Sequence, residues 1–203
     1  MLQCTSGLAF NSAGDLFEAD AYSDNIYEFT PGGVQSTFAS GLDYPWGLAF
    51  NSAGDLFTSD LMSGTIYEFT PGGARSTFAS GLNEPTGLAF NSAGDLFVAE
   101  QSAGIIYEFT PGGVQSTFAS GLGGPLGLAF NNAGDLFEAD AFSGNINEFT
   151  PGGVASTFAS GLPDPQGLAF QGVTLPVPEP SALGLLAVGV TALFIRRRRR
   201  AAV

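Results

Sequence analysis

The sequence predicts an all-β chain folded as a β-propeller, because it is built from four nearly identical repeats with four strand-like segments each. The tetrapeptide Gly-Leu-Ala-Phe begins at Gly7, Gly47, Gly87, Gly127 and Gly167. About 25 of the 40 positions are identical in all four complete copies. The 203 residues include 29 Gly, 12 Pro and 19 Phe, which favours turns and strands over helices. The predicted blades are residues 7–46, 47–86, 87–126 and 127–166, followed by a stub, 167–170.

Each repeat contains four short runs with strand chemistry. In the first copy we predict strands at Gly7–Phe10, Leu16–Asp20, Ile26–Thr30 and Val34–Ser40. Four antiparallel strands in each repeat are typical of a propeller blade. The small residues of the first strand suit the crowded axis, so we expect this strand to be innermost. An open β-solenoid and a two-sheet sandwich are the alternative architectures.

The connections divide into a uniform and a variable set. The first and third contain Asn-Ser-Ala-Gly and Thr-Pro-Gly-Gly in nearly every copy, and these residues favour tight turns. The second and fourth, Ala21–Asp24 and Gly41–Trp46 in the first copy, differ between repeats. In an up-and-down blade the second and fourth connections share one end. We expect the ligand-binding loops at this end.

The repeat resembles the NHL repeat and its relatives in the gluconolactonase-like superfamily. The resemblance covers residues 5–170 and rests on the order Pro45–Asn51, Gly54–Phe57, Asp60 and Ile66–Phe69. Propellers of this group usually have six blades, so the resemblance implies that four blades and a stub form an incomplete ring. Unclosed blades would expose apolar faces, and self-association is then expected.

The chain ends in three segments that together indicate membrane sorting. A Pro-rich linker, 171–181, precedes an apolar stretch, 182–195, which we predict to be a transmembrane helix. The Arg-rich segment 196–203 is then cytoplasmic by the positive-inside rule. Its stop-transfer residues are Arg196, Arg197, Arg198, Arg199 and Arg200. A hydrophobic core helix with a basic cap is the alternative.

This tail resembles the PEP-CTERM sorting signal, whose motif is matched by Val177, Pro178, Glu179, Pro180 and Ser181. The resemblance implies an exosortase-type membrane protease as partner, in a Gram-negative bacterium that makes exopolysaccharide. The protein would be held in the cell membrane by its C-terminal anchor and then released to the envelope or the extracellular matrix. Residues 1–6 lack the basic and apolar regions of a secretory signal, so we expect an export signal to be missing from this sequence.

Charge limits the classes of partner. The chain has 19 acidic and 6 basic residues, and Arg75 is the one basic residue before the tail. Nucleic acid is therefore an unsuitable partner, whereas polysaccharides, proteins and cations remain candidates. The single Cys4 cannot form an internal disulfide.

Four acidic residues recur at the end of the second strand of each repeat: Asp20, Asp60, Glu100 and Asp140. Their hard oxygen ligands suit Ca²⁺, so calcium is a candidate cofactor. The alternative is that each carboxylate caps its own following loop. Four aromatic residues of the variable end could stack on sugar rings: Tyr22, Tyr44, Trp46 and Phe142. Packing between blades is the alternative for these.

We therefore predict a non-enzymatic, exported envelope or matrix protein with a binding face for a glycan or a protein. The absence of histidine excludes Ser-His-Asp chemistry and disfavours the histidine-dependent streptogramin lyases of related fold. Two alternatives are a calcium-dependent, lactonase-like hydrolase, as the superfamily resemblance implies, and a truncated product without activity. The metal ligands of the lactonase-like enzymes cannot be matched residue by residue.

Overall fold

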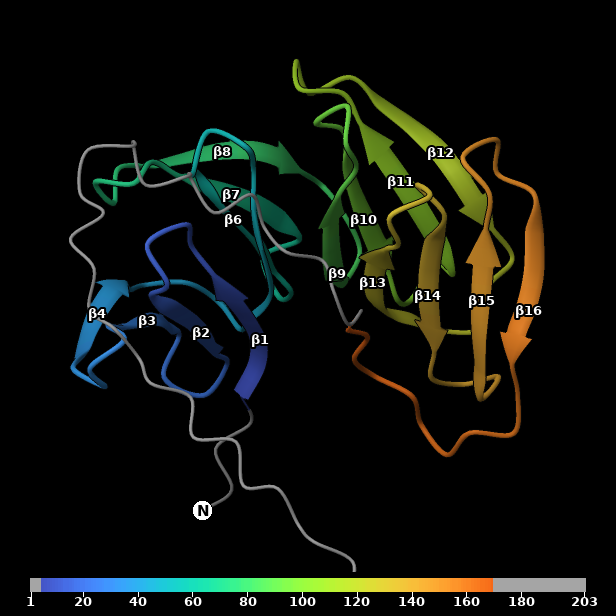
Figure 1. Cartoon of the computed structure of the whole chain (residues 1–203), viewed down its shortest axis with the longest axis horizontal. Coiled ribbons are helices and arrows are strands. Elements are labelled where there is room, and N and C mark those ends of the chain that lie inside the picture. Colours follow the sequence, from blue (N-terminus) through green and yellow to red (C-terminus); the bar gives the residue numbers. More distant parts are fainter. Residues whose placement is uncertain (1–4, 170–203) are drawn as a thin grey trace, which may run out of the picture.

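Four four-stranded antiparallel sheets follow one another around a common axis (Figure 1). The computed structural model describes residues 5–169. Each sheet contains four consecutive strands in chain order, so each sheet is one blade of a propeller. The predicted fold is confirmed for these residues. The predicted transmembrane helix and the sorting tail lie outside the described residues.

The strands recur at the same places in each repeat. The first strands of blades one to four are β1 (Thr5–Phe10), β5 (Pro45–Phe50), β9 (Pro85–Phe90) and β13 (Pro125–Phe130). The second strands are β2 (Leu16–Asp20), β6 (Leu56–Asp60), β10 (Leu96–Glu100) and β14 (Leu136–Asp140). The third strands are β3 (Asn25–Phe29), β7 (Thr65–Phe69), β11 (Ile105–Phe109) and β15 (Asn145–Phe149). The fourth strands are β4 (Gln35–Ala39), β8 (Arg75–Ser80), β12 (Gln115–Ser120) and β16 (Ala155–Ala159).

The uniform connections are tight turns held by their own side chains. The Oδ1 atom of Asn11 accepts hydrogen bonds from the backbone N–H groups of Ala13 and Asp15, at 3.0 and 2.8 Å. Gly14 follows with a φ of 88°, a conformation that favours glycine. The same arrangement recurs in the other three repeats, so this end of the propeller is nearly the same in each blade.

The first strand of each blade is innermost, as predicted. A Cβ atom on Gly87 would lie against the carbonyl oxygen of Leu126, on the first strand of the next blade. Gly7, Gly47 and Gly127 meet their next neighbour in the same way. The first strands of consecutive blades therefore approach too closely for any side chain at this position.

Adjacent blades are joined by an apolar contact that we call a seam. In the first seam, Phe17, Ala19 and Ile26 of blade one pack against blade two, which contributes Leu48, Leu56 and Phe69. The ring of Phe17 lies edge-on to those of Phe38 and Phe50, with centroids 5.0 and 5.1 Å apart. Edge-to-face pairs add about 0.5–1.5 kcal/mol to the burial of each ring. Equivalent clusters form the second and third seams.

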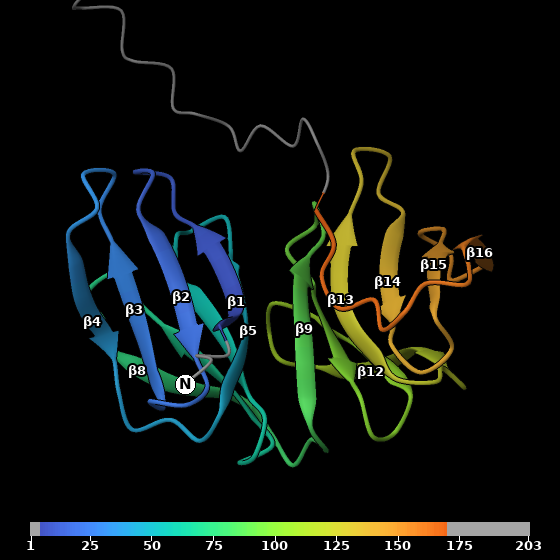
Figure 2. The same cartoon turned by 90° about the horizontal axis from the view of Figure 1, so that it is seen from below.

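The four blades form an open arc, with blade one and blade four at its two ends (Figure 1, Figure 2). Leu8 of β1 is 61% exposed, whereas the equivalent Leu48 of β5 is 8% exposed. Phe158 of β16 is also mostly exposed, at 66%. A six-bladed ring stays a prediction, because the described residues contain four blades. Within residues 5–169 there is no helix long and apolar enough to cross a membrane.

Candidate functional site

The variable end of the arc carries exposed apolar side chains on its second connections. Tyr22, Met62 and Phe142 hold equivalent positions in blades one, two and four, and they are 65%, 61% and 73% exposed. The equivalent residue of blade three is Ser102. Tyr22 and Phe142 belong to opposite ends of the arc (Figure 1), so the structure places these two predicted residues on the same end of the blades but not side by side. Met62 was not predicted, although aligning the repeats would have revealed it.

The two other predicted aromatic residues lie together. The rings of Tyr44 and Trp46 are stacked, with centroids 6.1 Å apart and planes 16° apart. Tyr44 has a φ of 65°, and its N–H group donates a 3.1 Å hydrogen bond to Oδ1 of Asp24. Asp24 itself has a φ of 57° at a position where the other repeats have glycine. Glu84 and Asp164, at the position of Tyr44, also have positive φ values, so the backbone conformation recurs and the Tyr44 and Trp46 side chains are what distinguish this repeat.

Trp46 also lines a small cavity on the axis of the arc. This opening has a volume of about 140 Å³ and is formed by the innermost strands, with Trp46, Leu126 and Gln166 among its lining residues. These three residues occupy the same place in the first, third and fourth repeats, directly before the innermost glycine. The cavity therefore differs chemically from blade to blade, and Trp46 supplies a large aromatic surface on one side.

The four recurring acidic residues bind backbone N–H groups of the loops. Asp20 accepts hydrogen bonds from the N–H groups of Tyr22 and Ser23 in its own second connection. Asp60 instead accepts from the N–H group of Asp43, at 2.9 and 3.0 Å, in the connection that enters its blade. Glu100 does the same with Asn83. The predicted alternative, in which each carboxylate caps its own loop, thus describes Asp20 but not Asp60 or Glu100.

Asp140 combines both kinds of contact. It accepts from Gly123 and Gly124 of the incoming connection, at 2.6 and 3.0 Å, and from Ser143 of its own loop at 3.0 Å. Asp20, Asp60, Glu100 and Asp140 are all buried, and burial raises the pKa of Asp60 to about 6. Within residues 5–169, no three side chains of the His, Cys, Asp or Glu type are grouped so that they could hold a metal ion. Calcium binding by Asp20, Asp60, Glu100 and Asp140 stays a prediction.

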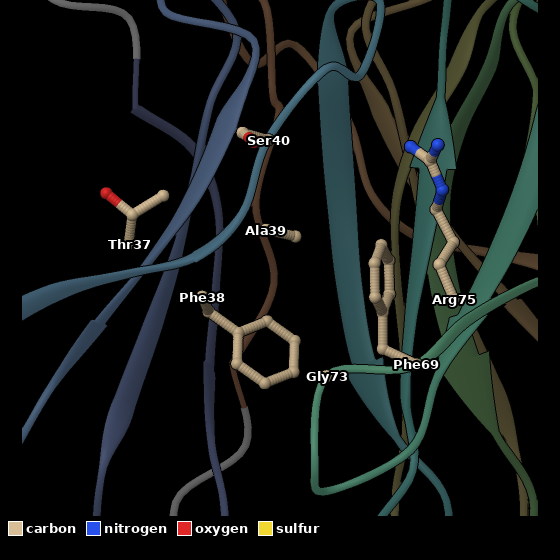
Figure 3. Close-up of a pocket in the computed structure, with 7 residues that line it drawn as sticks. All are labelled: Thr37, Phe38, Ala39, Ser40, Phe69, Gly73 and Arg75. Atoms are coloured by element: carbon tan, nitrogen blue, oxygen red, sulfur yellow. The ribbon is translucent and has the colours of Figure 1, made fainter.

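A larger cleft lies on the outer side of the first seam, between blade one and blade two. It has a volume of about 300 Å³, and Figure 3 shows Phe38 and Phe69 at the cleft together with Arg75. The Nη1 atom of Arg75 donates a 3.2 Å hydrogen bond to the carbonyl oxygen of Gly41, and its guanidinium lies 5.0 Å from the centroid of the Tyr67 ring. Arg75 thus ties the second blade to the connection that enters it.

Glu138 is a buried acid of the third seam, and the sequence places it, like Glu18, beside the recurring acids that are candidates for calcium binding, two residues earlier on the same side of the strand. Glu138 is fully buried, and within the described residues its Oε1 atom has no hydrogen-bond partner. Burial raises the pKa of Glu138 to about 7, with a smaller contribution from the nearby Asp140 carboxylate. The equivalent positions hold Glu18, Thr58 and Val98. This position is therefore acidic in blades one and four, and small or apolar in blades two and three.

The tail matches the model of the PEP-CTERM protein-sorting motif over residues 176–200. The predicted sorting signal is therefore confirmed, and the motif indicates an exported protein that is anchored and then processed. No curated protein sequence is significantly similar to the chain.

Solved propeller structures share the fold at low sequence identity. Virginiamycin B lyase from Staphylococcus aureus is 19% identical, with a TM-score of 0.70 over 79% of this chain and 57% of the lyase. Nidogen in its complex with laminin is 23% identical, with a TM-score of 0.77 over 84% of this chain and 70% of that chain. A putative gluconolactonase is 19% identical, with a TM-score of 0.73 over 83% of this chain and 68% of that chain. The predicted likeness to NHL-type and gluconolactonase-like propellers is confirmed for the fold.

These structures are longer than the part of the chain that matches them, and their roles differ from one another. The chain spans less than three fifths of the length of the virginiamycin B lyase structures that it matches. Two of the three kinds of neighbour carry the names of enzymes, and nidogen was solved in complex with another protein. The chain is therefore a β-propeller arc joined to a sorting signal, on a fold that serves both enzymes and binding proteins.

Proposed function

We propose that this chain is a non-enzymatic, exported protein of the cell envelope or extracellular matrix, and that the variable end of its propeller arc binds polysaccharide. The observation that carries the proposal is the stacked pair Tyr44 and Trp46, of which Trp46 lines the axial cavity. The sugar ring of a polysaccharide presents a flat C–H face that packs well on such aromatic surfaces. The uniform end offers no comparable variation between blades, so specificity belongs to the variable end.

The charge of the arc favours a neutral glycan over an anionic one. Arg75 is the one basic residue before the tail, and its guanidinium is already engaged by Gly41 and Tyr67. A ligand rich in phosphate or sulfate would meet an acidic surface and be repelled. Tyr22, Met62 and Phe142 extend the apolar contacts along the loops and would bind further sugar units of a long chain.

The sorting motif supports the proposed location. An exosortase-type protease would recognise the segment around Pro178–Pro180 after the apolar stretch 182–195 has entered the membrane. The arginines that follow would hold the end of the chain in the cytoplasm. Cleavage would then release the propeller to the outer surface, where polysaccharide is present.

Two features support a binding role over catalysis. The sequence contains no histidine, whereas a catalytically inactive form of virginiamycin B lyase was made by replacing a histidine with alanine. The buried carboxylates of the variable end are occupied by backbone N–H groups. In the part of the chain that the structure describes, no three side chains of the His, Cys, Asp or Glu type are grouped so that they could hold a metal ion.

Trp46 is the single tryptophan of the chain, so its fluorescence reports directly on the proposed site. Titration with a soluble neutral polysaccharide should change the Trp46 emission in a saturable way. The Tyr44→Ala variant should weaken binding by about tenfold, as the loss of one stacked ring contributes about 1.4 kcal/mol. The matched control Tyr67→Ala removes an aromatic ring that lies beside Arg75 and does not line the axial cavity, and it should leave affinity unchanged. Saturable binding of a basic protein with no response to any glycan would show a protein-binding face instead.

A further inference from the structure

The axial cavity differs chemically from the acidic chain around it. Its walls come mostly from the start of the innermost strands β5, β9 and β13, and β1 and residues 166–168 complete them. Among the described residues that line it, none has a charged or a hydroxyl side chain, although the chain contains 19 acidic residues. Because an unpaired charge is costly to enclose in such surroundings, the cavity selects an uncharged group.

Two kinds of surface line the cavity. Leu88, Leu126 and Leu128 supply apolar side chains, whereas Gly87 and Gly127 beside them contribute backbone alone. Each innermost strand is also the last strand of its sheet, so within residues 5–169 no strand pairs with its axial edge. Such an edge presents backbone N–H and C=O groups. The cavity therefore offers apolar contacts and amide hydrogen bonds side by side.

The size of the cavity limits what can enter it. Its volume is about 140 Å³, close to that of an engineered protein cavity of about 150 Å³ that holds one benzene molecule. A hexose unit with its hydroxyl groups is larger than benzene, so the cavity cannot enclose a whole sugar. A single substituent of a sugar is small enough to enter.

Trp46 connects the stacking surface to the cavity. Its half-buried ring stacks on that of Tyr44, and the same residue lines the cavity. The lining residues of β5, β9 and β13 directly follow the variable fourth connections, so the cavity belongs to the variable end. A sugar ring on the Tyr44 and Trp46 pair therefore has a substituent beside the cavity.

An acetamido group combines the properties that the cavity requires. It is small and uncharged, and it carries a methyl group next to an N–H and a C=O group. We propose that the polysaccharide bound at the variable end carries acetamido groups, and that one of them enters the axial cavity while its sugar ring stacks on Tyr44 and Trp46. This inference rests on the proposed function. A hydroxyl substituent in the same place would make no apolar contact with Leu88, Leu126 and Leu128.

Two oligosaccharides that differ in one substituent of each sugar unit test the inference. Chitohexaose carries an acetamido group where cellohexaose carries a hydroxyl group, and both are neutral. Calorimetric titration of the full chain, in a polyoxyethylene detergent whose head group contains no sugar, should show chitohexaose binding about tenfold tighter. Equal affinities, or tighter binding of cellohexaose, would overturn the inference and leave polysaccharide binding in place. Saturable binding of neither oligosaccharide would count against the proposed function itself.

The Leu126→Trp variant tests whether the preference arises in the cavity. Its equivalent in the first repeat is Trp46, so this place in the repeat accommodates an indole, which would occupy much of the cavity. The variant should bind both oligosaccharides as weakly as the parent binds cellohexaose. The matched control Val114→Trp adds an indole at an exposed position before β12 and should keep the tenfold preference.

A preference for chitohexaose that persists in folded Leu126→Trp would show that the acetamido group binds elsewhere, and the inference would fail. Circular dichroism establishes whether the variant is folded. If it is not, the two affinities of the parent chain decide the outcome by themselves.

Discussion

The Nδ2 atom of Asn147 donates a 2.8 Å hydrogen bond to the Oε2 atom of Glu138 inside the third seam. The equivalent pair in blade three is Tyr107 and Val98. The fourth blade thus has a polar pair where blade three has an aromatic and an aliphatic side chain. The Oε1 atom of Glu138 has no hydrogen-bond partner within the described residues. The third seam is therefore the joint whose stability should depend most on pH.

We predict that the free energy of unfolding falls as the pH rises through the pKa of Glu138. The pKa of Glu138 is raised from 4.5 to about 7, so between these values the folded chain holds a proton that the unfolded chain releases. The free energy of unfolding is then highest below pH 4.5 and decreases by up to about 3 kcal/mol as the pH passes 7. Asp60, with its pKa raised to about 6, adds a change of the same sign. Glu138→Gln should flatten this dependence in urea unfolding followed by circular dichroism, and an unchanged slope would contradict the assignment.

The innermost glycines should tolerate no side chain where a next strand follows. Gly87→Ala would press a methyl group against the carbonyl oxygen of Leu126, and we expect a loss of more than about 3 kcal/mol or failure to fold. Gly167→Ala is the matched control, since Gly167 has the same place in the repeat and a Cβ atom there would meet no atom of residues 5–169 within 4 Å. Thermal unfolding of the two variants measures the difference, and equal effects would argue against close packing at the axis.

We predict that the buried carboxylates of the variable end stabilise the fold through their hydrogen bonds to the loop backbone. Asp140→Asn weakens three hydrogen bonds to the loop backbone, and we expect a loss of about 1–3 kcal/mol. Differential scanning calorimetry with and without millimolar calcium separates this role from metal binding. A rise in Tm with calcium in the parent chain that is lost in Asp140→Asn would instead establish the calcium site suggested by the sequence.

The sorting motif can be tested by its product. In a host with an exosortase, and with the chain exported by a fused signal peptide, Glu179→Ala together with Pro180→Ala should leave the five terminal arginines attached. Mass spectrometry of the C-terminal peptide from membrane and extracellular fractions measures this. The control Pro176→Ala should be processed normally. Efficient release of the double variant would show that the match at 176–200 does not direct cleavage.

The repeat pattern predicted the strands to within one or two residues and the order of strands in each blade, because turn residues and apolar runs recur in register. It also placed the innermost strand correctly, since only glycine meets the steric demand at the axis. The hydrogen-bond partners of the four recurring acids could not be predicted from the sequence in the same way. Asp60 and Asp20 look alike in sequence, yet Asp60 accepts from Asp43 in the connection from the preceding blade, whereas Asp20 accepts from Tyr22 and Ser23 of its own loop.

The same reason explains the exposure of Leu8. Its local sequence, Gly-Leu-Ala-Phe, is identical to that of Leu48, so no local rule distinguishes the two residues. Burial depends on which blade lies alongside, and that is a property of the whole arc. The stacking of Tyr44 on Trp46 depended in turn on the left-handed backbone of Tyr44 and Asp24, which propensities do not predict for tyrosine.

The chemical sameness of the seams has a consequence for how such genes change. Each joint pairs Phe, Ala or Ser, and Ile with Leu, Leu and Phe, so a blade can be removed or inserted without presenting its neighbours with an unfamiliar surface. Near-identical coding stretches are also prone to unequal recombination, which deletes or duplicates whole units. Chains of this kind should therefore differ from strain to strain in steps of one 40-residue unit, with the spacing between Gly-Leu-Ala-Phe marks kept constant.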